Sequence, residues 1–262
     1  PDLWTEGFGQ TFRERFGYDV EPFMAHLDLH PDARYDYRRH LSDAVLDGFY
    51  RPFARVCRDL GGVARVQCHG SPTDLLAAYA SADVPESEAV LFDPPFSRIA
   101  ASAAAFAGRP IVSAEAFTCL YGWVPYPGPG PHQGSERLGD LRLCADALIA
   151  NGVNFLVWHG MPHGAPDCPL RFYATVHVGP DAAFAEGLPA FNAYLTDVCA
   201  RMRRGRPAHD LGVYLPLEDA WMLGELPPRL RRPSAVYHWE LHHAAHPPET
   251  RGRRPVWLSG DL

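Results

Sequence analysis

Glu115 is the residue whose type and position most clearly suggest chemistry. It ends the segment 111–115, read Ile-Val-Ser-Ala-Glu, in which an apolar start leads directly to a carboxylate. Burial directly after an apolar segment favours the protonated form of a glutamate, which can act as an acid. Polar neighbours instead stabilise the ionised carboxylate, which can act as a base. A structural glutamate paired with an arginine fits the same position. Glu115 is therefore a candidate catalytic carboxylate with a structural alternative.

A second acidic group precedes it in the chain. Asp83, Glu86 and Glu88 stand around the end of a predicted strand over residues 82–88. A solvated acidic loop is the plain alternative, because charged side chains are mostly exposed. If one of the three faces Glu115, the pair supplies the proton donor and the carboxylate that hydrolysis of a glycosidic bond requires.

Histidines and tryptophans near strand ends are candidates for ligand binding. His69 and His159 each follow a predicted strand and precede a glycine, so each could donate a hydrogen bond to a ligand hydroxyl. A structural histidine fits both positions equally well. Trp4 and Trp123 could offer an apolar platform for the face of a sugar ring. Trp158 lies in an all-apolar run, which favours core packing.

A metal site is the competing interpretation. His159 and His163, with Asp167 and Cys168 nearby, are residue types that ligate zinc. Glycines and a proline between them make this segment a loop, so the helical spacing of a zinc-hydrolase motif does not form there. The sequence has no glycine-rich phosphate loop after a strand and no G-x-S-x-G segment, which argues against nucleotide and serine-hydrolase chemistry. Further zinc-type ligands are His242, His243 and His246.

Alternating strands and helices would hold these candidates. Short apolar segments predict strands, and helical apolar spacing that ends at glycine predicts helices. The predicted strands cover 63–68, 82–88, 110–116, 153–158 and 211–215, and the predicted helices cover 5–15, 21–27, 38–60, 96–107, 135–151 and 184–202. Pro52 should bend or split the third helix. The alternation favours a parallel α/β architecture, in which strand ends carry functional groups.

The number of strands bears on the completeness of the fold. About four strands precede residue 208, whereas a (β/α)8 TIM barrel has eight. Either the N-terminal half of the barrel lies upstream in the same polypeptide, or the sheet is open. Beyond residue 208 the composition turns to proline, histidine and arginine. We predict the C-terminal half of a barrel over 1–208 and the start of a second α/β domain over 209–262.

Composition narrows the class of protein. The 262 residues carry a net charge of −7 without long runs of one sign, so neither nucleic acid nor a membrane is an expected partner. The longest apolar stretch, 99–107, is far shorter than the ~20 residues that span a bilayer. Six cysteines without a C-x-x-C pair indicate separate reduced thiols. We expect a soluble protein, and the sequence leaves bacterial cytoplasm, periplasm and secretion open.

Six segments, in their order and spacing, resemble one protein family. From about Trp4 to Tyr214 the chain resembles the barrel of glycoside hydrolase family 106, the α-L-rhamnosidases and their relatives. The resemblance implies a (β/α)8 catalytic barrel in a larger enzyme that removes terminal L-rhamnose with inversion, helped by a calcium ion that holds the sugar. The six segments are 4–8 (WTEGF), 15–19 (RFGYD), 36–39 (DYRR), 67–70 (QCHG), 113–118 (SAEAFT) and 151–154 (NGVN).

The resemblance also suggests residue roles. Segment 113–118 resembles the family strand that carries an active-site glutamate, here Glu115, and Asp83 and Glu88 resemble acidic positions of the preceding strand. Gln67 departs from the pattern, because characterised members carry a glutamate there and an amide cannot donate the leaving-group proton. Glu86 or Glu88 could take that role, or this branch could act on another glycoside or be inactive.

Our leading hypothesis is a glycoside hydrolase in which Glu115 pairs with Glu88 and other side chains bind a carbohydrate substrate. The alternatives are an inactive carbohydrate-binding barrel, which Gln67 favours, and a metal-dependent hydrolase that uses His159 and His163. The predicted substrate-binding residues are Gln67, His69, Asp83, Glu86, Trp123 and His159.

Overall fold

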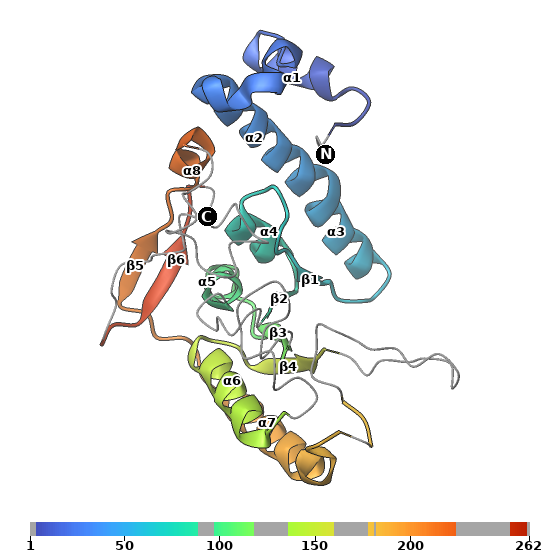
Figure 1. Cartoon of the computed structure of the whole chain (residues 1–262), viewed down its shortest axis with the longest axis vertical. Coiled ribbons are helices and arrows are strands. Elements are labelled where there is room, and N and C mark those ends of the chain that lie inside the picture. The colour runs from blue at the N-terminus through green and yellow to red at the C-terminus, as the bar shows by residue number, and fades with distance from the viewer. Residues whose placement is uncertain are drawn as a thin grey trace.

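The fold is an α/β arrangement built on a parallel sheet (Figure 1). The computed structural model describes residues 4–88, 97–117, 136–159, 178–180, 182–223 and 252–260. In these ranges the sheet has four parallel strands in chain order: β1 (Arg65–Gln67), β2 (Val84–Glu88), β3 (Ser113–Ala116) and β4 (Phe155–Trp158). Parallel neighbours need crossover connections, and these contain α4 (Leu75–Ser81), α5 (Arg98–Phe106) and α6 (Leu138–Ala150). The predicted α/β class is confirmed, and closure into a barrel stays a prediction.

Register divides the sheet into an apolar face and a polar face. Side chains alternate along a strand, and register partners on parallel strands share a face. Ala114 and Ala116 of β3 are fully buried in the main hydrophobic core, which also contains residues of the helices. Ser113 and Glu115, which alternate with them, therefore lie on the opposite face. This polar face carries two rows of register partners, Gln67 with Glu86 and Ser113, and Glu88 with Glu115.

The chain reaches this sheet through a helical segment at its N-terminal end (Figure 1). It contains α1 (Phe8–Phe16), the 3-10 helix η1 (Glu21–Leu29), α2 (Pro31–Val45), the π-helical turn η2 (Leu46–Tyr50) and α3 (Arg51–Asp59). The helix predicted over 38–60 begins earlier, at Pro31, and keeps helical backbone angles where α2, η2 and α3 join. The expected disturbance at Pro52 takes the form of the wide π-helical turn η2, which ends two residues before this proline, because proline lacks the N–H for a helical bond. Gly17 ends α1 in the left-handed conformation, whereas the helix predicted over 5–15 begins later, at Phe8, with Gly7 at its N-cap position.

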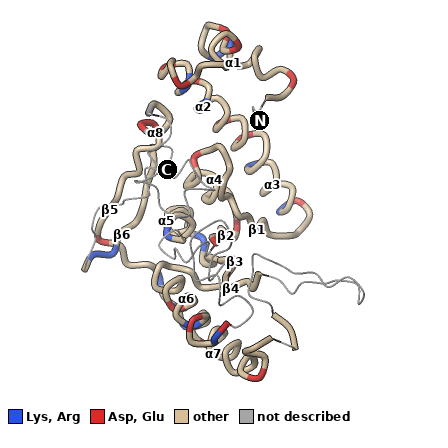
Figure 2. The backbone as a smooth tube through the Cα atoms, viewed as in Figure 1, with Lys and Arg blue, Asp and Glu red and all other residues tan. Residues whose placement is uncertain are grey.

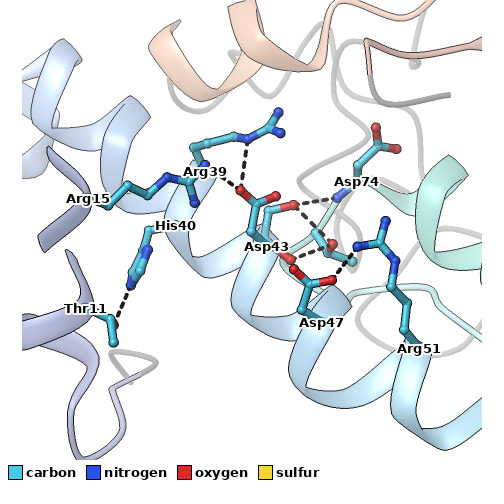
Figure 3. Close-up of polar contacts among 10 residues, drawn as sticks. Thr11, Arg15, Arg39, His40, Asp43, Asp47, Arg51 and Asp74 are labelled. Atoms are coloured by element: carbon cyan, nitrogen blue, oxygen red, sulfur yellow. Dashed lines mark hydrogen bonds and ion pairs between the residues drawn. The ribbon is translucent and has the colours of Figure 1, made fainter.

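Polar contacts tie this segment to the rest of the fold (Figure 3). The hydroxyl of Thr11 on α1 lies 2.9 Å from Nε2 of His40 on α2. Ser42 of α2 accepts a 2.9 Å hydrogen bond from the backbone N–H of Asp74. The Asp74 carboxylate caps α4 and also accepts a hydrogen bond from the hydroxyl of Ser259, so it links α4 to the residues after β6. Sequence analysis missed α4, although an aspartate before an apolar run is a helix-start signal.

The C-terminal residues pack on the same body. After the short 3-10 helix η6 (Ala185–Gly187), α7 (Leu188–Met202) lies beside α6, and α8 (Leu217–Leu223) contacts α2 (Figure 1). A separate parallel pair consists of β5 (Leu211–Tyr214) and β6 (Pro255–Leu258). Trp257 of β6 donates its backbone N–H to the Ser102 hydroxyl of α5 at 2.9 Å, and Trp257 and Val213 belong to the main core. The boundary near residue 208 stays a prediction, and the described residues beyond it contact those before it.

Charge and cysteine usage can also be compared with the described residues. Figure 2 shows basic and acidic positions mixed along α6 and α7, for example in the 2.9 Å pair of Arg201 with Asp197. Exposed pairs of this kind contribute little stability. No described helix is both long and apolar enough to cross a bilayer. Four described cysteines are free, as predicted: Cys57, Cys68, Cys144 and Cys199.

Candidate active site

Two glutamates lie beside each other at the carboxyl ends of β2 and β3. Glu88 is the last residue of β2, and its register partner on β3 is Glu115. Neighbouring strands are about 4.8 Å apart, and register partners point to the same face. The two candidates that the sequence analysis paired are thus adjacent on the polar face of the sheet.

Their environment separates their protonation states. Burial raises the pKa of Glu88 to about 8, and the negative charge of Glu115 adds to this rise. At pH 7 the Glu88 carboxyl therefore holds its proton, as a general acid must. A protonated carboxyl next to an ionised one can divide acid and base roles between them.

His159 directly follows β4, and its side chain lies beside Glu115. Its Nδ1 is 3.2 Å from Oε1 of Glu115, and the two side chains are each 25% exposed. The backbone N–H of His159 donates to the carbonyl of Ala116 at 3.2 Å, which extends the pairing of β3 and β4 by one residue. His159 therefore places a ring nitrogen against the carboxylate whose negative charge helps to raise the pKa of Glu88.

Gln67 and Glu86 belong to a different row from this pair. Gln67 is aligned with Glu86, two residues before Glu88 on the same strand face. The Glu86 carboxylate is buried, accepts a 2.8 Å hydrogen bond from Ser113 and lies 3.3 Å from Nε of Arg65. These contacts hold the Glu86 carboxylate inside the sheet, between Ser113 and Arg65. The side-chain nitrogen of Gln67 is buried without a hydrogen-bond partner among the described residues.

Asp83 lies at the opposite end of β2. It precedes Val84, the first residue of that strand, whereas Glu88 ends it. Its carboxylate is 2.9 Å from Arg58 and 3.4 Å from Arg109, and it accepts the backbone N–H of Ala64 at 3.0 Å. The expected clustering of Asp83 with Glu88 is therefore corrected. Four residues of extended chain lie between the two positions, so Asp83 is at the amino end of the sheet.

His69 lies two residues beyond Gln67 and is held by Tyr79 of α4. The Tyr79 oxygen is 3.1 Å from each ring nitrogen of His69, and the tyrosine is fully buried. Burial is the main cause of the raised pKa of Tyr79, and the negative charge of Glu88 adds to it, so these side chains lie near one another. Sequence analysis missed Tyr79, because a tyrosine in a short apolar helix carries no functional signal.

The described tryptophans lie outside this cluster. The Trp158 ring stacks on Phe184, with centroids 6.2 Å apart, and its indole N–H donates to Asn192 at 3.1 Å. The predicted core role of Trp158 is therefore confirmed. Trp4 packs on Phe8 in the N-terminal segment. Other candidates lie outside the described residues: Trp123, His163, Asp167, Cys168, His242, His243 and His246.

The described side chains do not form a metal site by themselves. Within these ranges no group of three or more His, Cys, Asp and Glu side chains is placed to hold an ion. Calcium takes six to eight oxygen ligands, and a Glu88 carboxyl that keeps its proton at pH 7 is a poor ligand. The calcium implied by the family resemblance does not fit the described residues alone.

Glu88 is expected to reduce stability at neutral and alkaline pH. Its pKa rises from 4.5 to about 8 on folding, so its favourable contribution is complete below pH 4.5 and is lost as pH rises to 8. Glu88→Gln should therefore be more stable than the wild type at pH 8, by on the order of 1 to 3 kcal/mol. Urea unfolding at pH 5 and pH 8 measures this. The exposed Glu14 provides the control Glu14→Gln, and a less stable Glu88→Gln at pH 8 would contradict the assignment.

Comparison with known proteins points to one family. A family model for glycoside hydrolase 106, described as alpha-L-rhamnosidase, matches residues 2–235. A Formosa agariphila protein with a provisional beta-glucuronidase name is 24% identical over an alignment of 228 positions, and the match covers 80% of this chain and 18% of that protein. The solved structure of a rhamnosidase from Novosphingobium sp. PP1Y matches with a TM-score of 0.67 and 20% identity, over 98% of this chain and 24% of that one. This chain spans less than a quarter of the length of either relative, and at 20% identity the structural likeness concerns the fold.

Proposed function

The chain belongs to glycoside hydrolase family 106, the α-L-rhamnosidases, and from this premise we propose that it carries the active site for hydrolysis of terminal α-L-rhamnosides or a related glycoside. One observation carries the proposal: Glu88 and Glu115 are register partners at strand ends, and the pKa of Glu88 is raised to about 8. Cleavage of a glycosidic bond needs one protonated and one ionised carboxyl, and this pair supplies both.

In the proposed reaction Glu88 is the general acid and Glu115 is the base. Glu88 gives its proton to the glycosidic oxygen as the bond to the anomeric carbon breaks, so the leaving group departs as a neutral alcohol. Glu115 takes a proton from a water molecule whose oxygen attacks that carbon from the other side. His159 donates to Glu115 and keeps its charge available until the water arrives. Each carboxyl ends in the protonation state that the other had, and bulk water restores both.

The proposed outcome is inversion, which the family resemblance implies. Inversion requires the two carboxyl groups to be roughly 6.5 to 9.5 Å apart, and retention about 5 to 5.5 Å. Adjacent strands set the two Cα atoms about 4.8 Å apart, so the splay of the side chains decides between the two. Proton NMR of the first product formed identifies the anomer. Net retention would make Glu115 a nucleophile instead of a base.

Sugar binding is proposed for the polar groups around the pair. His69, held by Tyr79, and the amide nitrogen of Gln67, which has no partner within the part of the chain that the structure describes, are the proposed donors to sugar hydroxyls. Because Gln67 lies in the row of Glu86, it leaves the place of the proton donor to Glu88. Trp123 stays a proposed platform for the sugar ring on sequence grounds.

We also propose that the four strands belong to a (β/α)8 barrel. Their strict chain order, without the reversal found in doubly wound sheets, supports this. In such a barrel the face with Gln67, Glu86 and Glu115 lines the interior, and the carboxyl ends of the strands carry the site.

Turnover of aryl glycosides tests the proposed function. An aryl α-L-rhamnoside is the expected substrate. An aryl β-D-glucuronide is the second candidate, because the Formosa agariphila relative carries that name. The competing hypothesis of an inactive carbohydrate-binding barrel predicts calorimetric binding of L-rhamnose without hydrolysis of either compound.

Calcium stays a proposal that the family alone supports. If an ion helps to hold the sugar, EDTA should raise KM for the aryl rhamnoside, and calcium but not zinc should restore it. The metal-dependent alternative with His159 and His163 predicts that zinc restores kcat. Unchanged kinetics after EDTA would count against both ions.

A further inference from the structure

Phe117 has the most unusual backbone conformation in the described part of the chain. Its φ is +72°, and among the described residues it is the only non-glycine residue with a positive φ. This left-handed conformation is rare and strained for an aromatic residue, and it persists only where the surroundings impose it. Phe117 directly follows β3 and stands two residues after Glu115.

Contacts from different elements hold this residue in place. Its ring is 1% exposed and packs against Trp158 of β4, with centroids 4.5 Å apart, and against Phe191 of α7 at 6.2 Å. The thiol of Cys144 on α6 forms a hydrogen bond with the Phe117 backbone. The side chain and the main chain are therefore anchored separately, which can sustain a strained φ.

The strained residue adjoins the groups proposed to do the chemistry. The carbonyl of Ala116 accepts the N–H of His159, and the His159 ring lies 3.2 Å from Glu115. A return of Phe117 to an ordinary negative φ would change the direction in which the chain leaves β3. That change would loosen the bond at Ala116 and with it the contact between Glu115 and His159.

We propose that Phe117 is a positioning residue, whose anchored left-handed backbone fixes the end of β3 and thereby holds Glu115 beside His159 and Glu88. Its catalytic meaning rests on the proposed function. The placement of Glu115, in contrast, can be measured without any substrate.

An ordinary core residue would behave differently, and the chain offers a matched control. Phe191 belongs to the same aromatic cluster, is 6% exposed and has its ring 5.9 Å from that of Trp158. It lies within α7 and lacks a positive φ. Phe117→Leu and Phe191→Leu each remove one phenylalanine ring from this cluster, but Phe191→Leu keeps the Phe117 ring and its closer contact with Trp158, with centroids 4.5 Å apart.

The position of Glu115 is read from the titration midpoint of Glu88. This midpoint is measured by carbon NMR of protein labelled at the glutamate δ carbon. Glu88→Gln identifies its signal, which should titrate near pH 8 in the wild type. Glu115→Gln shows how far this midpoint falls when the neighbouring charge is absent. Phe117→Leu should reproduce a large part of that fall, because Glu115 moves away, and Phe191→Leu should leave the midpoint at its wild-type value.

A folded Phe117→Leu protein with an unchanged Glu88 midpoint would overturn the proposal, as would an equal fall in Phe191→Leu. If Phe117→Leu does not fold, Cys144→Ala removes only the hydrogen bond to the turn, and it must lower the midpoint for the proposal to stand. In an active protein Phe117→Leu should also lower kcat about 10- to 100-fold through misplacement of Glu115. If the wild type hydrolyses no glycoside, the NMR result still decides the role of Phe117, and only the proposed function fails.

Discussion

Replacement of Glu115 by glutamine is expected to lower kcat for an aryl α-L-rhamnoside by about 10²- to 10⁴-fold, the usual contribution of a general base. Glutamine keeps the size of the side chain and a carbonyl oxygen that can accept a hydrogen bond from His159, which lies 3.2 Å from Glu115. It cannot take a proton from the attacking water. Initial rates give kcat, and calorimetry with L-rhamnose should show that sugar affinity is kept.

Two control variants distinguish a catalytic role of Glu115 from a general effect of losing a carboxylate. Glu14→Gln removes one exposed carboxylate on α1 and should retain wild-type kinetics. Asp83→Asn weakens the ion pairs of Asp83 with Arg58 and Arg109 at the amino end of the sheet, so it should lower the unfolding midpoint while kcat is kept. Full turnover in Glu115→Gln would remove Glu115 from the catalytic pair.

The second large effect is expected for Glu88 in the pH dependence of kcat/KM. Activity should fall as pH rises through about 8, because burial and the charge of Glu115 raise the pKa of Glu88 to that value and only the protonated acid can donate. Below this pH Glu88 is mostly protonated and can donate, and the fall of kcat/KM at higher pH records the loss of that proton. Rates measured between pH 5 and pH 10 should therefore show a basic limb that disappears in Glu88→Gln.

The choice of leaving group separates acid catalysis from a structural effect. For a rhamnoside with a poor, alkyl leaving group, Glu88→Gln should lower kcat/KM by about 10²- to 10⁴-fold. For a dinitrophenyl rhamnoside, whose leaving group departs without protonation, the same substitution should cost far less. An equal loss with both substrates would show that Glu88 shapes the site without donating a proton.

Much of the fold could be predicted from local patterns. The strand with Glu115 was found because its apolar start leads directly to that glutamate, and a disturbance of the helix near Pro52 was expected because proline lacks the N–H for a helical bond. The helix after Asp74 was missed since it has only seven residues, too few for a clear helical period. A polar residue at every second position of a strand, as in Ser113 and Glu115, was an unused signal for the polar face.

The candidate site could be predicted only in part. Sequence analysis grouped Asp83, Glu86 and Glu88 because they are close in the chain, but β2 places them at its start, inside the sheet and at its end. It also left Glu86 and Glu88 as alternative proton donors in place of Gln67. Parallel pairing puts Glu86 in the row of Gln67 and Glu88 in the row of Glu115, which supports the proposal that Glu88 is the acid.

By itself the sequence determined the residue types at the strand ends, the α/β alternation and the family resemblance, since these depend on neighbours along the chain. The tertiary structure decided which glutamates are adjacent, how far Glu88 is desolvated and why Phe117 keeps a strained backbone. The physical reason is that register, burial and strain arise from contacts between residues far apart in sequence. The pKa of about 8 at Glu88 shows this most directly, because its causes are burial by the fold and the charge of a residue on the neighbouring strand.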